Sequence, residues 1–264
     1  MNNVLILDLT ANHLGWEFNS AQKQERALHN LGLKVFLEKF EELTECLGQN
    51  ESSPNNPAHT FYDIQNKFHE KCKEINLLLD QIDYVNIRCH GQYENGHGYA
   101  DLFCSKNRQL GNFEVIANFE ILLQLIPNLK SKDIFFTICH GGHAIQPFIF
   151  NGLTPNNQNY IFSLEPVLDN FSLKALTYYI RRQLANGESP RESFDHLFNS
   201  IKTDLYSLNK DDRKLLLRNW KKISPELAED NNWKKYIDSI LVNYLYMENP
   251  SEIFETFSEQ CHQQ

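Results

Sequence analysis

This chain of 264 residues lacks the sequence signatures of a disulfide framework, of a phosphate-binding surface and of a membrane span. Its six cysteines are too few and too scattered for the scaffold of a disulfide-rich secreted protein. Basic residues are outnumbered, since 25 Lys and Arg against 34 Asp and Glu give a formal net charge of −9 at pH 7. That balance argues against a protein held to nucleic acid by phosphate contacts, so we expect no nucleic-acid partner.

Long hydrophobic runs are also missing. The amino-terminal segment MNNVLILD has no basic region, and its apolar run of four residues is too short for a signal peptide or a membrane span. We therefore expect a cytoplasmic protein with no membrane span, whose cysteines stay reduced. Export by a secretion system that needs no signal peptide stays open. The high asparagine content and the missing signal are compatible with a bacterial effector.

The chain does contain enough apolar material for a core. Hydrophobic residues make up 41% and charged residues 22%, which excludes disorder across the whole chain. The length suits one large domain, or one domain with a small appendage.

The predicted elements alternate between strands and helices up to about residue 187. Apolar, β-rich runs predict strands over 4–7, 34–37, 83–88, 133–138 and 160–163. Residue spacing and turn formers predict helices over 17–31, 62–79 and 113–126, and loops over 48–59 and 91–110. Further helices are expected from Ser189-Pro190 onward and over 210–222, 233–247 and 251–259. The order predicts a doubly wound, mostly parallel α/β domain over 1–187 and a helical C-terminal extension over 188–264.

Two of the predicted strands end in the same unusual way. The third strand leads into RCHG at 88–91, and the fourth leads into ICHGG at 138–142. Ligands bind outside the carboxyl ends of strands in open parallel sheets, and neighbouring strands would bring both tips to one edge. A thiol becomes a nucleophile when a nearby base favours the thiolate, and glycine allows backbone N–H groups to form an oxyanion hole. The two tips therefore predict a nucleophile, a base and oxyanion donors.

The two segments together resemble the caspase-like (clan CD) cysteine peptidases, which include caspases, metacaspases, separase and CHAT domains. YVNIRCHGQYENGHGYADLF at 84–103 is similar to their strand, His-Gly, loop, Gly, strand block, and KDIFFTICHGG at 132–142 resembles their nucleophile strand. His90 and Cys139 are separated by about fifty residues, as is typical of the family. The resemblance covers roughly residues 1–187.

This resemblance implies a cysteine endopeptidase acting on a protein or peptide, with no cofactor. Cys139 would be the nucleophile, and His90 would be the base that activates it and protonates the leaving amine. The backbone N–H groups of Gly91 and Cys139 would be the oxyanion donors.

The resemblance also suggests substrate contacts near the residue before the scissile bond. Thr137 stands two positions before the cysteine, where metacaspase-like enzymes have an acidic residue and caspases have Gln. Thr137 fits neither pattern, so the preferred substrate side chain stays open. Asn12 and His13 follow the first strand, where the family draws other residues of this subsite.

A second resemblance competes with the first. TICHGGHAI at 137–145 is similar to the nucleophile elbow of the class I glutamine-amidotransferase-like superfamily. In this interpretation Cys139 pairs with His140, and Glu17 is the acid. The loop after the third strand should then be rich in Pro-Gly-Gly, whereas it reads CHGQ, and His90 has no role. The caspase-like interpretation is therefore favoured.

Non-enzymatic interpretations also stay open. A caspase-like scaffold without activity could bind a protein partner, for which the helical C-terminal region is the expected surface. A zinc site would draw on six side chains: Cys89, His90, His97, Cys139, His140 and His143. Neither loop has a C-x₂-C pair, and neighbouring side chains on a strand point to opposite faces, so we predict no metal site.

The other cysteines are expected to be packing residues. The alternation in the third strand places Cys89 on the face of Val85 and Ile87, opposite Tyr84, Asn86 and Arg88. Four further cysteines are expected to be core or surface filler: Cys46, Cys72, Cys104 and Cys261.

Overall fold

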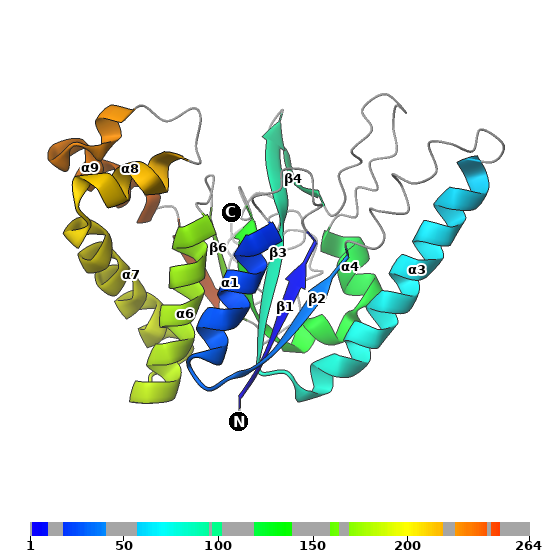
Figure 1. The fold of residues 1–264 in the computed structure, drawn as a ribbon. Coiled ribbons are helices and arrows are strands. Elements are labelled where there is room, and N and C mark those ends of the chain that lie inside the picture. Colours follow the sequence, from blue (N-terminus) through cyan, green and yellow to red (C-terminus); the bar gives the residue numbers. More distant parts are fainter. Residues whose placement is uncertain are drawn as a thin grey trace, which may run out of the picture.

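The computed structural model describes residues 2–9, 18–40, 57–94, 97–101, 119–138, 159–163, 169–218, 225–241 and 244–248. A central sheet is covered by helices on both faces, and Figure 1 shows α3 and α4 on one side and α1, α6 and α7 on the other. The expected α/β class, with a sheet between two layers of helices, is confirmed.

The sheet has seven strands within the described residues. Their bounds are β1 Asn3–Asp8, β2 Lys34–Lys39, β3 Tyr84–Glu94, β4 His97–Asp101, β5 Asp133–Ile138, β6 Asn159–Ser163 and β7 Tyr244–Glu248. The order across the sheet is β2-β1-β3-β5-β6-β7, with β4 paired to β3 outside this path. Neighbours from β2 to β6 are parallel, whereas β4 on β3 and β7 on β6 are antiparallel.

The central strands are apolar because both of their faces are covered. In β5, five of the six residues of DIFFTI are buried, and the predicted bounds 133–138 are those observed. The strands predicted over 4–7, 34–37 and 160–163 are likewise confirmed, each longer by one to two residues.

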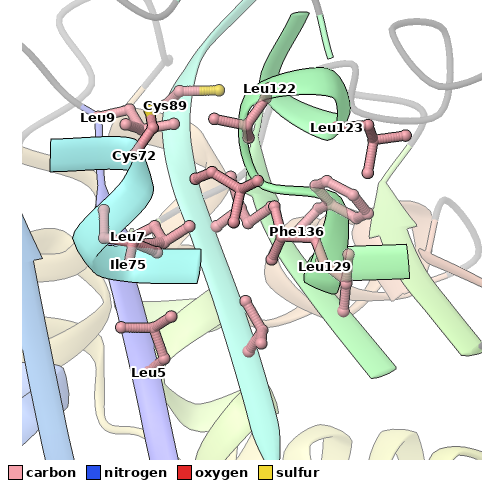
Figure 2. Close-up of a cluster of buried hydrophobic side chains, with 14 of the residues drawn as sticks. Leu5, Leu7, Leu9, Cys72, Ile75, Cys89, Leu122, Leu123, Leu129 and Phe136 are labelled. Atoms are coloured by element: carbon pink, nitrogen blue, oxygen red, sulfur yellow. The ribbon is translucent and has the colours of Figure 1, made fainter. Parts of the chain in front are cut away.

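The first helical layer consists of α3 and α4 with two short 3₁₀ turns. Their bounds are α3 Pro57–Leu78, η2 Leu79–Gln81, α4 Phe119–Leu125 and η4 Pro127–Ser131. Odd-numbered residues of β1 and β3 and even-numbered residues of β5 pack beneath this layer. Figure 2 shows this cluster, with Leu5, Leu7, Cys72, Ile75 and Phe136 among its labelled side chains.

The second helical layer covers the opposite face. Its bounds are α1 Phe18–His29, α6 Asp169–Asn186, α7 Pro190–Ser207, α8 Lys210–Arg218, η5 Pro225–Ala228 and α9 Asp230–Leu241. A second core cluster joins Val4, Ile6 and Phe135 of the sheet to apolar residues of α1, α6, α7 and α9. Trp233 of α9 is fully buried there, and its Nε1 donates to the carbonyl oxygen of Leu205 at 2.8 Å.

Local sequence signals explain where several helices begin and end. Gly32 (φ 79°) and Gly187 (φ 66°) follow α1 and α6 in the left-handed region, where glycine carries no steric penalty. Ser189 caps α7 in a reciprocal capping box with Glu192, and Pro190 occupies the first turn as expected.

Three sequence-based predictions are wrong in their extent. The third strand does not end at residue 88, because β3 continues to Glu94 and pairs with β4, so the loop predicted over 91–110 begins with a hairpin. Helix α3 begins at Pro57, inside the loop predicted over 48–59. The helix predicted over 233–247 stops at Leu241, and residues 244–248 form β7. The helix predicted over 251–259 lies outside the described residues.

The region after residue 188 is therefore not all-helical. Helices α7 and α9 share a core cluster with β1 and β5, and β7 extends the sheet by pairing with β6. The division predicted at residue 187 marks a change in the pattern of elements, while the core continues across it.

Candidate active site

The predicted reactive residues directly follow, in the chain, the last paired position of two adjacent parallel strands. The last paired position of β3 and β5 joins Cys89 to Ile138. His90 follows Cys89 within β3, where its backbone pairs with Asp101 of β4. Cys139 follows Ile138 in the chain and lies outside the described residues. The expected neighbour relationship of the two strands is thus present.

Gly91 lies in the β3–β4 hairpin, where its Cα partner is Ala100. Strand β3 rises beyond the rest of the sheet into this hairpin (Figure 1). Within the segment 84–103 that resembles a strand, His-Gly, loop, Gly, strand block, residues 90–94 and 97–101 pair as antiparallel strands. The oxyanion role of Gly91 stays a prediction.

A buried ion pair lies beneath this edge, on the face covered by α1. Asp8 of β1 and Arg88 of β3 are register partners and are 4% and 2% exposed. Arg88 Nε lies 4.0 Å from Asp8 Oδ1, and Arg88 Nη1 donates to Gln24 Oε1 of α1 at 3.1 Å. The contacts of Arg88 thus link β1, β3 and α1, and removal of one partner of the ion pair takes a counter-charge away from the other in a buried position.

A second polar contact links β3 to β5 on the same face. Asn86 Nδ2 donates to the carbonyl oxygen of Phe135 at 2.8 Å and to the hydroxyl oxygen of Thr137 at 2.9 Å. Asn86 is fully buried and Thr137 is 7% exposed. The Thr137 hydroxyl is therefore engaged with Asn86 inside the fold. A direct contact between Thr137 and substrate stays a prediction.

The two described thiols belong to the core. Cys89 and Cys72 are both in the cluster between the sheet and α3, as expected from the alternation in the strand (Figure 2). Burial raises the pKa of the Cys72 thiol to about 12, against a smaller opposing effect of Lys71. A thiol held neutral at physiological pH is a poor nucleophile, so Cys72 is a packing residue.

The structure brings together no set of zinc ligands within the ranges that it describes. No group of three His, Cys, Asp or Glu side chains suited to a metal ion occurs among them. Of the six residues considered for zinc, Cys89 is buried in the core, and His90 and His97 are placed by their backbones at the two ends of the hairpin.

Several predicted site residues lie outside the described part of the chain. They are Asn12, His13, Glu17, Cys139, His140 and His143. The amidotransferase-like alternative depends on three of them, Glu17, Cys139 and His140.

Four buried polar residues beneath the edge are not among the residues predicted for the site: Asp8, Gln24, Asn86 and Arg88. For the three in strands, a polar or charged residue inside an apolar run was a usable signal. Such residues are almost never fully buried without a partner, so their presence in β1 and β3 pointed to contacts between strands.

A small pocket lies at the opposite edge, where β3, β5 and β6 begin. Tyr84, Asp133, Asn159 and Tyr179 contribute to its lining. Asp133 Oδ1 accepts hydrogen bonds from the backbone N–H and the side-chain amide of Asn159 at 3.1 and 3.0 Å. These contacts hold the beginnings of two strands together, far from residue 90.

Comparisons with known protein families, with curated proteins and with solved structures found no match. In the part of the chain that the structure describes, no helix is both long and apolar enough to cross a membrane.

Proposed function

We propose that this protein is a cysteine endopeptidase in which His90 and Cys139 act as a catalytic dyad. The observation that supports this most directly is the register pair Cys89 and Ile138 on β3 and β5. Adjacent strands lie about 4.8 Å apart, and consecutive Cα atoms lie about 3.8 Å apart. Residues 90 and 139 are each joined by one peptide unit to a position in this pair.

The side chains on one face of the sheet also support the pairing of His90 with Cys139. Arg88 and Thr137 are register partners, and both belong to the α1-facing row of side chains. Residues 90 and 139 each come two positions later in the sequence, and two residues are one full period of an extended strand. A base and a nucleophile at matching positions on adjacent strands are what a dyad requires.

The β3–β4 hairpin adds a second line of support. The resemblance to caspase-like peptidases depends on a strand that continues through His-Gly into a loop and a returning strand. The antiparallel pairs His90 with Asp101 and Gly91 with Ala100 have that form.

The proposed reaction proceeds through an acyl-enzyme. The Cys139 thiolate attacks the scissile carbonyl carbon, and a C–S bond forms as the C–N bond breaks. The His90 imidazolium gives its proton to the leaving amine. Water then attacks the thioester while His90 accepts a proton from it, the C–S bond breaks, and the acid product is released as the Cys139 thiolate and the His90 imidazolium are restored. Backbone N–H groups, including that of Gly91, would stabilise the oxyanion.

Alkylation of the folded protein tests the dyad without knowledge of the substrate. Iodoacetamide at neutral pH should modify Cys139 faster than an unperturbed thiol, since a paired base raises the thiolate fraction. The modified residue is identified by peptide mass spectrometry. His90→Ala should slow modification of Cys139 to the rate of an ordinary thiol, whereas equal rates in the two proteins contradict the proposal.

Cleavage is tested with a library of peptides derived from a whole proteome. New amino termini should appear with the wild-type protein and be absent with Cys139→Ala. A His140→Ala variant tests the alternative enzyme class. If His140→Ala loses both modification of Cys139 and cleavage while His90→Ala retains both, an amidotransferase-like elbow is favoured. A Cys139 that reacts no faster than an ordinary thiol and cleaves nothing favours a binding protein without activity.

A further inference from the structure

The sheet contains a polar side-chain contact at a position where an apolar residue would satisfy packing. Asn86 is the third residue of β3 and is fully buried. On the same face, the neighbouring strands carry Ile6 and Phe135 as its register partners, and both are buried apolar residues. Asn86 is therefore an exception within an otherwise apolar row.

The geometry of Asn86 is fixed by its two acceptors. A backbone carbonyl can only accept, so the 2.8 Å contact with the Phe135 oxygen identifies the amide nitrogen as the donor. The second amide hydrogen is directed to Thr137 Oγ1 at 2.9 Å. Both acceptors belong to β5, so the whole donor capacity of the amide connects β3 to β5.

Stability alone gives little reason for this arrangement. A typical internal hydrogen bond contributes about 0.5–1.5 kcal/mol net, whereas full burial of an aliphatic side chain contributes about 1.5–3 kcal/mol. Asn86 Oδ1 has no hydrogen-bond partner among the described residues, which adds a desolvation cost. An aliphatic residue at position 86 would make the sheet at least as stable.

What the contact does provide is a fixed register. A slip of β3 by one residue would turn Asn86 to the other face of the sheet and break both hydrogen bonds. Apolar side chains tolerate small displacements, because their contacts are not directional. The two hydrogen bonds are directional, and they fix the register of β3 against β5 at positions 86, 135 and 137.

We propose that Asn86 and Thr137 are positioning residues: by fixing the register of β3 against β5, they set the position of His90 relative to Cys139. This inference rests on the proposed function. Asn86 stands four residues before His90, and Thr137 stands two residues before Cys139, so the hydrogen-bonded pair spans the two strands that carry the dyad. Thr137 in this role acts through β5 and does not select the substrate.

The ion pair next to Asn86 supports the same role on the other side of β3. Arg88 is held against Asp8 of β1 and Gln24 of α1, which fixes β3 laterally. Strand β3 is thus held on both sides by polar contacts in the last positions before His90. A rigid support of this kind is what a site with precise donor and acceptor distances needs.

The test is the pH dependence of Cys139 alkylation by iodoacetamide in the folded full-length chain. Thr137→Val removes the hydroxyl with little change of shape, and Asn86→Leu removes both donors. Each variant should lower the alkylation rate at pH 6.5 about tenfold, as expected for a small misplacement. Each should also shift the midpoint of the profile toward that of an ordinary thiol. Thr137→Ser restores the hydroxyl and should restore the wild-type profile.

A matched control separates positioning from loss of stability. Asn76 Oδ1 of α3 accepts from the backbone N–H of Asn128 at 2.9 Å, which connects two elements away from this edge. Asn76→Ala should lower the melting temperature and leave the alkylation profile unchanged. Thr137→Val with a wild-type profile overturns the inference while the dyad stands. A wild-type protein whose Cys139 reacts as an ordinary thiol, with no effect of His90→Ala, overturns both.

Discussion

Cys89 and Ile138 are register partners on adjacent parallel strands, and each directly precedes one residue of the proposed dyad. The pair itself is buried and faces α3 and α4. The opposite face of the two strands carries Asn86, Arg88 and Thr137 toward the same end of the sheet. Near this end of β3 and β5, the side that faces α3 and α4 is thus apolar, whereas the side that faces α1 carries buried polar residues.

Replacement of His90 should remove catalysis, and replacement of its neighbour Cys89 should not. We expect His90→Ala to lower the rate of peptide hydrolysis by about 10²–10⁴, the usual contribution of a positioned general acid and base. The rate is measured on a peptide that the library experiment shows to be cleaved.

Cys89→Ala is the matched control, because Cys89 packs in the core beside the same position. Its hydrolysis rate should stay within about threefold of wild type, since the variant changes packing and leaves the reacting groups in place. A large loss with Cys89→Ala and none with His90→Ala would mean that the reactive side chains have been assigned to the wrong residues.

The buried ion pair predicts a large loss of stability when one partner is removed and a smaller loss when both are removed. Arg88→Met leaves the Asp8 carboxylate buried without its guanidinium, and should lower the free energy of unfolding by about 3–5 kcal/mol. The measurement is urea unfolding followed by circular dichroism.

The double variant Asp8→Leu with Arg88→Met removes both charges and should recover most of this loss, because apolar replacement of a buried pair is often neutral or stabilising. If the double variant is no more stable than Arg88→Met alone, Asp8 and Arg88 do not compensate each other.

Much of the fold follows from local sequence patterns. The continuous apolar run in DIFFTI gave the exact bounds of β5, because a central strand is buried on both faces and needs no alternation. Ser189-Pro190 located the beginning of α7, since capping chemistry acts over one helical turn.

The errors arise where pairing is remote in the chain. YLYME at 244–248 reads as the continuation of a helix, and only its antiparallel partner β6, more than eighty residues earlier, makes it a strand. His90-Gly91 reads as the end of a strand, yet pairing with β4 extends β3 through it. Asn86 and Thr137 meet across 51 positions, and neither residue type signals that contact locally.

The core beneath α3 and α4 predicts a second stability effect. Phe136 of β5 is fully buried, and Phe136→Ala should lower the free energy of unfolding by about 3–5 kcal/mol through lost burial and a residual cavity. Leu77 of α3 is 74% exposed, so Leu77→Ala should change stability by no more than about 0.5 kcal/mol. Chemical denaturation compares the two, and equal losses would contradict the observed burial.

The Cys72 thiol predicts a dependence of stability on alkaline pH. Burial raises its pKa from 9.0 to about 12, so the folded protein keeps the proton where the unfolded chain loses it. The stabilising contribution is therefore complete below pH 9 and is lost as the pH rises from about 9 toward 12. Melting temperature measured across this window should fall, and the fall should be smaller in Cys72→Ala. Buried tyrosines add to the fall in both proteins, since burial raises the pKa of Tyr236 to about 12 as well. A Cys72→Ala protein whose melting temperature falls as steeply as that of wild type would show that this thiol is ionised equally in the folded and unfolded chain.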